Sequence, residues 1–237
     1  MAVTVRQALN RVLTAIGESS IDVLATSVTG TLPLKLLEFL NQFKEEIEDA
    51  NTWRALRTQV TVTVLANTNN VAIPNADERA RVVRVPEPQA GMLLPLVFDV
   101  NNPQNPIALV EIPLAELLYR ANTEGAGQTV QEPTYFAVDV QADAAILYVY
   151  PMPNVNRTVS LYMYIPQAVL AAADLDTAIK IPSLPLMKGV IWYALTDRGE
   201  EMGANSAFTE ERYRTSVDDA ISRDSAEQGT NDQLVVV

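Results

Sequence analysis

The stretch NQFKEEIEDANTWRALRTQVTVTVLANTNNVAIPNADERARVVRV, residues 41–85, decides the fold, because the rest of the chain is expected to pack against it. Its beginning places Phe43 and Ile47 at helical spacing. Residues 57–66 then alternate valine with polar side chains, which is the period of a half-buried strand. The sequence therefore predicts a helix that runs directly into a strand, followed by two shorter strands at residues 71–73 and 79–85.

Length and composition indicate a folded protein of one or two domains. The chain has 237 residues, 48% of them hydrophobic, which is enough to bury a core and is incompatible with general disorder. It contains no run of about 18 apolar residues, so no membrane span is predicted. Polar residues interrupt the first 16 positions, as in an amphipathic helix, and the mature protein is expected to begin near Met1.

Two residue types are missing from the sequence. The chain has no cysteine and no histidine, which excludes zinc sites built from these residues and catalytic triads with a histidine base. Any catalysis would have to rest on carboxylates, lysine or tyrosine. We therefore predict a protein without catalytic residues, cofactor or metal site.

The charge of the chain is strongly acidic. There are 17 basic and 29 acidic residues, for a net charge of −12. Residues 197–237 alone contain ten acidic and four basic side chains, so half of the excess lies there. An acidic surface repels nucleic-acid phosphates, so specific binding to DNA or RNA is not expected.

The chain opens with a predicted helix over residues 4–16. Thr4 and Gln7 have the spacing of a capping box, and Gly17 follows the last apolar position. A polar linker extends to residue 30. Three aliphatic residues in it are expected to anchor the linker to the core: Ile21, Val23 and Leu24.

Pro33 is placed to open a second helix. An acidic run occupies its C-terminal half: Glu45, Glu46, Glu48 and Asp49. Such a run can be imagined as a metal or acid–base cluster. Because it lies away from Phe43 and Ile47, we expect it to be a solvated face of the helix.

The middle of the chain is predicted to be mainly β. Apolar runs at 93–100 and 107–112 flank a loop rich in Asn and Pro and predict a hairpin, which a short helix over 113–121 follows. Three more strands are predicted, at 134–139, 145–150 and 158–165. The last two carry four tyrosines: Tyr148, Tyr150, Tyr162 and Tyr164. A tyrosine ladder can stack sugars or bases, but without basic neighbours we favour a half-buried sheet face.

The last third is predicted to be helical again. One helix spans 185–202, where Gly189 indicates a close backbone crossing, and another spans 206–223. The tail is polar up to residue 233 and then aliphatic: Leu234, Val235, Val236 and Val237. We expect an arm over 228–237 that orders on a partner, with pairing to the protein's own sheet as the alternative.

These elements predict an α+β fold. Residues 1–56 and 183–227 are expected to form one discontinuous helical bundle. Residues 57–182 are expected to form a central, mainly antiparallel β domain, and residues 228–237 the flexible arm.

Several short motifs, in this order, resemble one family of phage proteins. They are Ala8-Leu9-Asn10-Arg11-Val12-Leu13-Thr14-Ala15-Ile16-Gly17-Glu18, Trp53 before a strand, Ile73-Pro74 followed by Asp77 and Arg79, Tyr150-Pro151, and Ile181-Pro182 before a long helix. Together they are similar to the head-to-tail adaptor of short-tailed bacteriophages, also called tail tubular protein A or gatekeeper. The central region, 87–143, departs from a minimal adaptor.

The resemblance implies a structural virion protein at the head–tail junction, made in the host cytoplasm. Such adaptors form an oligomeric ring, usually dodecameric, between the portal protein and the tail nozzle protein, and DNA passes through the lumen without specific binding. A closed ring uses heterologous interfaces, so the helices need a second apolar surface. The expected ring contacts are Leu34, Leu37 and Val190, and the expected portal contacts are Leu234, Val235, Val236 and Val237.

Other interpretations of the sequence remain open. A tail terminator or stopper would be another neck component, although stoppers are mainly β and this chain begins and ends with helices. A carbohydrate-binding tail protein would use the tyrosine-bearing strands. A glycan-cleaving tail protein would need two carboxylates about 5–10 Å apart in a cleft.

Overall fold

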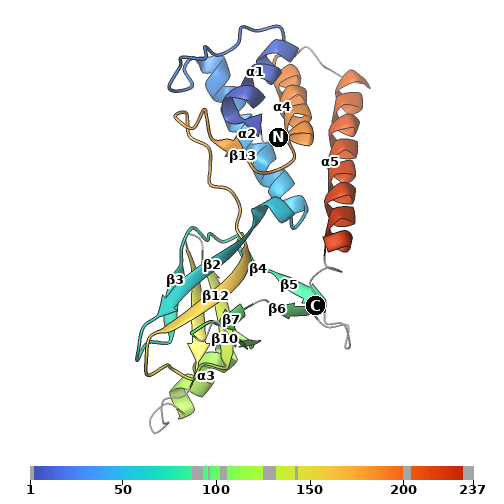
Figure 1. The fold of residues 1–237 in the computed structure, drawn as a ribbon. Helices are drawn as coiled ribbons and strands as arrows, with labels where there is room; N and C mark the ends of the chain where they lie inside the picture. Colours follow the sequence, from blue (N-terminus) through green and yellow to red (C-terminus); the bar gives the residue numbers. More distant parts are fainter. Residues whose placement is uncertain are drawn as a thin grey trace. The chain divides into compact units, whose positions relative to one another are not determined.

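The structure is a computed structural model that describes residues 3–86, 93–95, 97–101, 106–124, 132–141, 144–199 and 204–231 (Figure 1). It divides into two compact units. One contains Met1–Leu56 together with Gln167–Val237, and the other contains Arg57–Pro166. We call them the helical unit and the strand unit. Helices combined with mainly antiparallel sheets confirm the predicted α+β class.

In the described part of the helical unit, α1, α2 and α4 pack together, and the last helix of the chain, α5, packs against α4. The elements of this unit are β1 (Val3–Thr4), α1 (Val5–Ala15), α2 (Thr31–Ala50), a 3-10 turn η1 (Arg54–Leu56), β13 (Ala178–Ile179), α4 (Ser183–Asp197) and α5 (Ala204–Asn231). Helix α4 packs against α1, α2 and α5. The apolar face of α1 is buried: Val5, Ala8, Leu9, Val12 and Leu13.

The predicted start of the first helix is confirmed. The Thr4 hydroxyl accepts a hydrogen bond from the Gln7 amide, and the Gln7 side chain accepts one from the Thr4 amide, which completes the capping box. Just before the helix, β1 pairs antiparallel with β13, so that Val3 lies opposite Ile179. The two sequence segments of the helical unit are thereby joined.

The close crossing predicted at Gly189 lies between α4 and α2. A Cβ atom at Gly189 would stand 2.6 Å from Cδ1 of Phe43, which is well inside van der Waals contact. Only glycine lets the Phe43 ring lie against the α4 backbone at this point. The ring then packs edge-on against Tyr193 and Tyr213, at centroid separations of 4.9 and 5.0 Å.

The described part of the strand unit contains two larger sheets, a separate β5–β6 pair and one helix. Its elements are β2 (Arg57–Val64), β3 (Asn70–Ile73), β4 (Arg81–Val82), β5 (Arg84–Pro86), β6 (Leu93–Pro95), β7 (Val97–Asp99), β8 (Ile107–Ala108), β9 (Val110–Glu111), α3 (Leu114–Glu124), β10 (Tyr135–Gln141), β11 (Ala144–Tyr150) and β12 (Arg157–Tyr164). One sheet has the order β3-β11-β10-β9. The other has the order β2-β12-β7-β8, with β4 also paired to β12, while β5 and β6 pair separately.

The two larger sheets share one apolar core, and the alternating valines of residues 57–66 are part of it. Val60, Val62 and Val64 are all buried, and β2 pairs along its whole length with β12, with Val62 opposite Val159. Buried residues of β2 and β12 belong to the same cluster as those of β10 and β11. Helix α3 covers the other face of β10 and β11 through Leu117.

The structure differs from three expectations within the strand unit. The strand predicted at 79–85 is broken into β4 and β5, which pair with different partners. In the predicted hairpin, β7 and β8 do pair, but β9 turns away and runs parallel to β10. The tyrosines do not form one ladder, because β11 and β12 lie in different sheets.

Residues 167–182 belong to the helical unit, whereas the sequence pattern predicts that they are part of the β domain. The reason is long-range: β13 pairs with β1, and Val28 donates its backbone N–H to the carbonyl of Ala172. Helix α5 continues to Asn231, so residues 228–231 of the expected arm are helical. The remainder of the arm, 232–237, lies outside the described residues. Among the described helices, none combines the length and apolarity that a bilayer crossing requires.

Candidate interaction surfaces

The predicted contact residues occupy different environments in the structure. Leu34, in the first turn of α2, has an exposed fraction of 40%. Leu37 and Val190 are buried in the core of the helical unit, at 5% and 0%, so they are not available for contact between subunits. Their apolar character serves the packing of α2 against α4. The predicted portal contacts Leu234, Val235, Val236 and Val237 lie outside the described residues.

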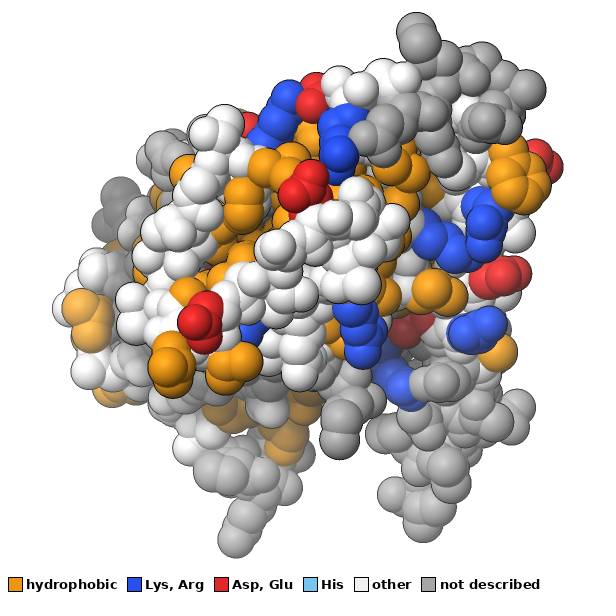
Figure 2. Space-filling view, turned by 90° about the horizontal axis from the view of Figure 1, so that it is seen from above, with side chains coloured by type: hydrophobic (Ala, Val, Ile, Leu, Met, Phe, Trp, Pro, Cys, Tyr) orange, Lys and Arg blue, Asp and Glu red, His pale blue; other side chains and the backbone are white. Residues whose placement is uncertain are grey.

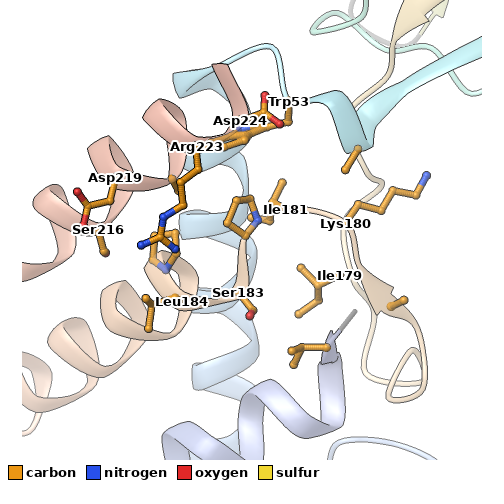
Figure 3. A pocket seen from close by; sticks show the side chains of 16 residues that line it. Trp53, Ile179, Lys180, Ile181, Ser183, Leu184, Ser216, Asp219, Arg223 and Asp224 are labelled. Carbon is orange, nitrogen blue, oxygen red and sulfur yellow. The ribbon is translucent and has the colours of Figure 1, made fainter. Parts of the chain in front are cut away.

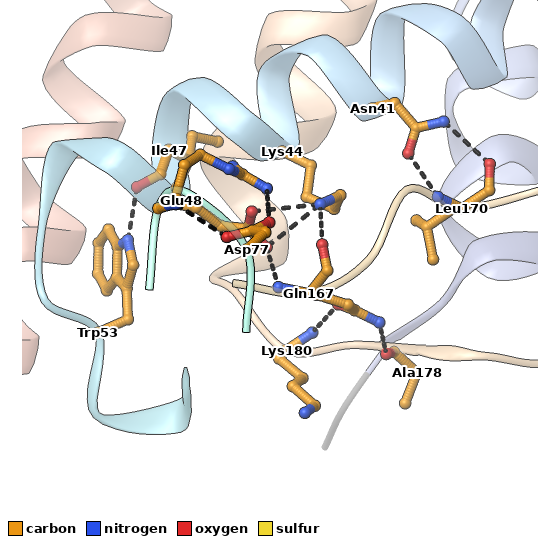
Figure 4. Close-up of polar contacts among 11 residues, drawn as sticks. Asn41, Lys44, Ile47, Glu48, Trp53, Asp77, Gln167, Leu170, Ala178 and Lys180 are labelled. Carbon is orange, nitrogen blue, oxygen red and sulfur yellow. Dashed lines mark hydrogen bonds and ion pairs between the residues drawn. The ribbon is translucent and has the colours of Figure 1, made fainter. Parts of the chain in front are cut away.

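A polar stripe on α2 holds the chain where it returns to the helical unit (Figure 4). Lys44 and Glu48 form an ion pair in which both side chains are fully buried, with Nζ 3.2 Å from Oε2. Lys44 also donates to the carbonyl of Gln167 over 2.6 Å, and Glu48 accepts from the Gln167 amide over 3.1 Å. One turn earlier, Asn41 exchanges two 2.9 Å hydrogen bonds with the backbone of Leu170.

This stripe corrects the prediction that the acidic run is a solvated face. Glu46 and Asp49 are exposed, but Glu48 is covered by the returning chain. The i, i+4 spacing of Lys44 and Glu48 is that of an ordinary surface pair. Its burial depends on residues more than 100 positions further along the chain, a relation that periodicity does not reveal.

Gln167 itself is hydrogen-bonded at every polar group. Its side-chain amide donates to the carbonyl of Ala178 over 2.9 Å and accepts from the Lys180 amide over 3.1 Å. The side chain thus binds a backbone group of β13, at Ala178, and one of the next residue after this strand, Lys180. Strand β13 is in turn paired with β1. The start of the returning segment is therefore fixed to α2 on one side and to β13 on the other (Figure 4).

The outgoing connection is fixed as well. Trp53 is buried, donates its indole N–H to the carbonyl of Ile47, and accepts a backbone hydrogen bond from Leu56. Asp224 of α5 accepts hydrogen bonds from the Asn51 side chain and the Arg54 amide. Both points at which the chain passes between the two units are thus anchored inside the helical unit.

A groove opens beside these anchors (Figure 3). It has a volume of about 600 Å³ and is formed by β1, β13, the start of α4 and the second half of α5. Trp53, Ile179 and Ile181 are nearly buried parts of its lining, whereas Leu184 is 51% exposed. Lys180 and Arg223 line it together with Asp219 and Asp224. We call this the α4–α5 groove.

The linker between α1 and α2 presents two aliphatic side chains to solvent. Val23 and Leu24 are exposed to 80% and 86%, which contradicts the expectation that they anchor the linker to the core. That role belongs to Val28, which is 4% exposed, and in part to the half-buried Ile21. We call residues 22–25 the aliphatic turn.

Three further observations concern possible chemistry and surface charge. Among the residues that the structure describes, no cluster of three or more acidic side chains is placed to hold a metal ion. Burial, and then the neighbouring Glu46 carboxylate, raises the pKa of the Tyr213 hydroxyl above its ordinary value. On the face drawn in Figure 2, basic and acidic side chains are interspersed with hydrophobic ones, and neither sign forms a continuous patch.

The model of the family described as SU10 adaptor protein matches residues 3–234, which is nearly the whole chain and includes both units. No curated protein matches the sequence.

Proposed function

Because this chain belongs to the SU10 adaptor protein family and is thus a structural component of a phage virion, we propose that it forms the ring that connects the portal to the tail nozzle. The observation that carries the proposal is a family match extending over both units. The anchored connections on either side of the strand unit suit a part that transmits mechanical load. An assembly role also needs none of the catalytic groups that the sequence lacks.

The apolar end of the sequence is the part that we propose contacts the portal. Burial of four adjacent aliphatic side chains contributes roughly 1.5–3 kcal/mol of binding free energy for each side chain, before the cost of ordering the arm. This gain is repeated in every subunit of a ring. Since α5 continues to Asn231, only two residues separate the end of this helix from Leu234 in the sequence.

Deletion of residues 233–237 is therefore expected to abolish association with the portal protein of the same phage. The full chain should co-sediment with portal rings, and the truncated chain should stay at the top of the gradient. The melting temperature should hardly change, because these residues follow the last described helix in the sequence. A truncated chain that co-sediments as well as the full one would exclude this arm as the contact.

We further propose that DNA passes through the ring without being bound. The net charge is −12, and arginines of the strand unit are engaged by carboxylates, such as Arg84 with Glu111 over 2.7 Å and Arg157 with Glu132 over 2.9 Å. Tight binding to duplex DNA needs free cations against the phosphates. The purified protein should therefore give no gel shift with duplex DNA at physiological salt. A submicromolar affinity with a steep salt dependence would contradict this.

The carbohydrate-binding alternative loses its main support in the structure. Tyr148 and Tyr150 lie on β11, while Tyr162 and Tyr164 lie on β12 in the other sheet. Tyr150 and Tyr164 are also buried. A sugar could not stack along these four rings together. Neither sheet therefore offers the aromatic platform that motivated this alternative.

A further inference from the structure

The aliphatic turn has the two most exposed large hydrophobic side chains of the described residues. Val23 and Leu24, at 80% and 86%, exceed the next value, 69% for Tyr119. Single exposed hydrophobic residues are common on protein surfaces. Two adjacent ones at the tip of one turn indicate a contact surface for another molecule.

The turn is held firmly by α1. The Arg6 guanidinium donates to the carbonyl of Asp22 over 2.6 Å and to that of Ala25 over 2.8 Å, on either side of the exposed pair. Asn10 exchanges hydrogen bonds of 2.7 and 3.2 Å with the backbone of Ile21. A contact made by this turn therefore costs little ordering, which is a property of good binding elements.

We propose that Val23 and Leu24 of one subunit insert into the α4–α5 groove of the next subunit. This inference rests on the proposed ring and names the contact that would build it. The volume of the groove, about 600 Å³, falls within the range of roughly 300–1,000 Å³ that is usual for ligand-binding pockets in proteins. Its exposed Leu184 and nearly buried Ile181 give an aliphatic surface for the inserted side chains.

The position of the two surfaces favours a second copy as the occupant. Both belong to the helical unit, and Figure 1 shows the linker that contains the turn on the side of α1 and α4 away from α5. A projection and a groove on different faces of one unit make a heterologous contact, which repeats from subunit to subunit and closes into a ring when the rotation permits.

Charge adds to this complementarity. Asp22 is the one charged residue of the aliphatic turn, and it lies next to Val23. The groove is lined by two cations, Lys180 and Arg223, and by Asp219 and Asp224. Asp224 already accepts hydrogen bonds from Asn51 and Arg54. The cations are thus the groups of the groove that suit an incoming carboxylate.

The absence of native cysteine permits a direct test by cross-linking. Rings assembled on the portal protein of the same phage from the double variant Leu24→Cys/Leu184→Cys should, after treatment with a short bismaleimide, give a ladder of covalent multimers. Neither single variant should extend beyond a dimer. The matched control is Leu24→Cys/Val169→Cys, whose second position is 64% exposed in the same unit but is not part of the groove.

A second test removes the apolar pair. Val23→Ser/Leu24→Ser should raise the concentration needed for ring assembly at least tenfold and leave the melting temperature of the free subunit unchanged, because both side chains are already in water. Val169→Ser should affect neither property. Rings that assemble normally without the pair, or that give no ladder, would overturn this contact and leave the proposed ring intact. If the wild-type chain forms no ring on the portal, the proposed function itself fails.

Discussion

Lys44→Met is expected to lower the free energy of unfolding of the free subunit by about 3–5 kcal/mol, which is the usual cost of removing one partner of a buried ion pair. Lys44 and Glu48 are both fully buried, and Lys44 also binds the carbonyl of Gln167. The substitution leaves the Glu48 carboxylate without this cation in a site closed to water. It also removes one of the four hydrogen bonds that hold Gln167.

The measurement is urea denaturation followed by tryptophan fluorescence. Both tryptophans, Trp53 and Trp192, lie in the helical unit, so the signal reports on the unit that contains the ion pair. Lys35→Met is the matched control. It makes the same change at the Lys35–Asp197 pair, whose side chains are 43% and 41% exposed, and should cost less than about 1 kcal/mol.

A double variant separates the pair from the packing around it. Lys44→Met/Glu48→Leu should recover the part of the loss that comes from the unpaired Glu48 carboxylate, since an apolar replacement of a buried pair is often neutral. The loss that remains measures the two hydrogen bonds to the Gln167 backbone. If Lys44→Met costs no more than Lys35→Met, then the stripe on α2 does not hold the returning chain, and the anchoring described for Gln167 is wrong.

Local features of the fold could be predicted from the sequence because their causes are local. The alternation of valine in residues 57–66 gave β2, and the spacing of Thr4 and Gln7 gave the capped start of α1. Gly189 stands out inside an otherwise apolar helix, and the structure shows the Phe43 ring at that point. In each case a residue and its near neighbours contain the information.

The features that could not be predicted depend on distant segments. Lys44 and Glu48 have the pattern of a solvated pair until Gln167 covers them. Leu37 and Val190 are buried core residues. An apolar residue of the core and an apolar residue of a contact between subunits look alike in the sequence. Val23 and Leu24 look like anchors for a linker, and the hydrogen bonds of Arg6 and Asn10 show that the turn is held without them.

The second prediction concerns assembly, where the expected effect is all or none. An open chain of subunits, each joined to the next through one projection and one groove, has an unoccupied contact surface at each of its two ends. Closure satisfies all of these surfaces together, so partial rings should be scarce once the portal gathers the subunits. Intermediates with a few copies should therefore not accumulate as portal and subunit are mixed in increasing ratio.

The measurement that tests the central claim most directly is the mass of the complex between this protein and the portal protein of the same phage. Native mass spectrometry should show the portal ring with a fixed number of copies of the 25.9 kDa chain, twelve if the resemblance to dodecameric adaptors holds. Class averages of the same sample by electron microscopy should show a closed second ring. A complex with one copy per portal ring, a spread of copy numbers without closure, or no complex would contradict the account.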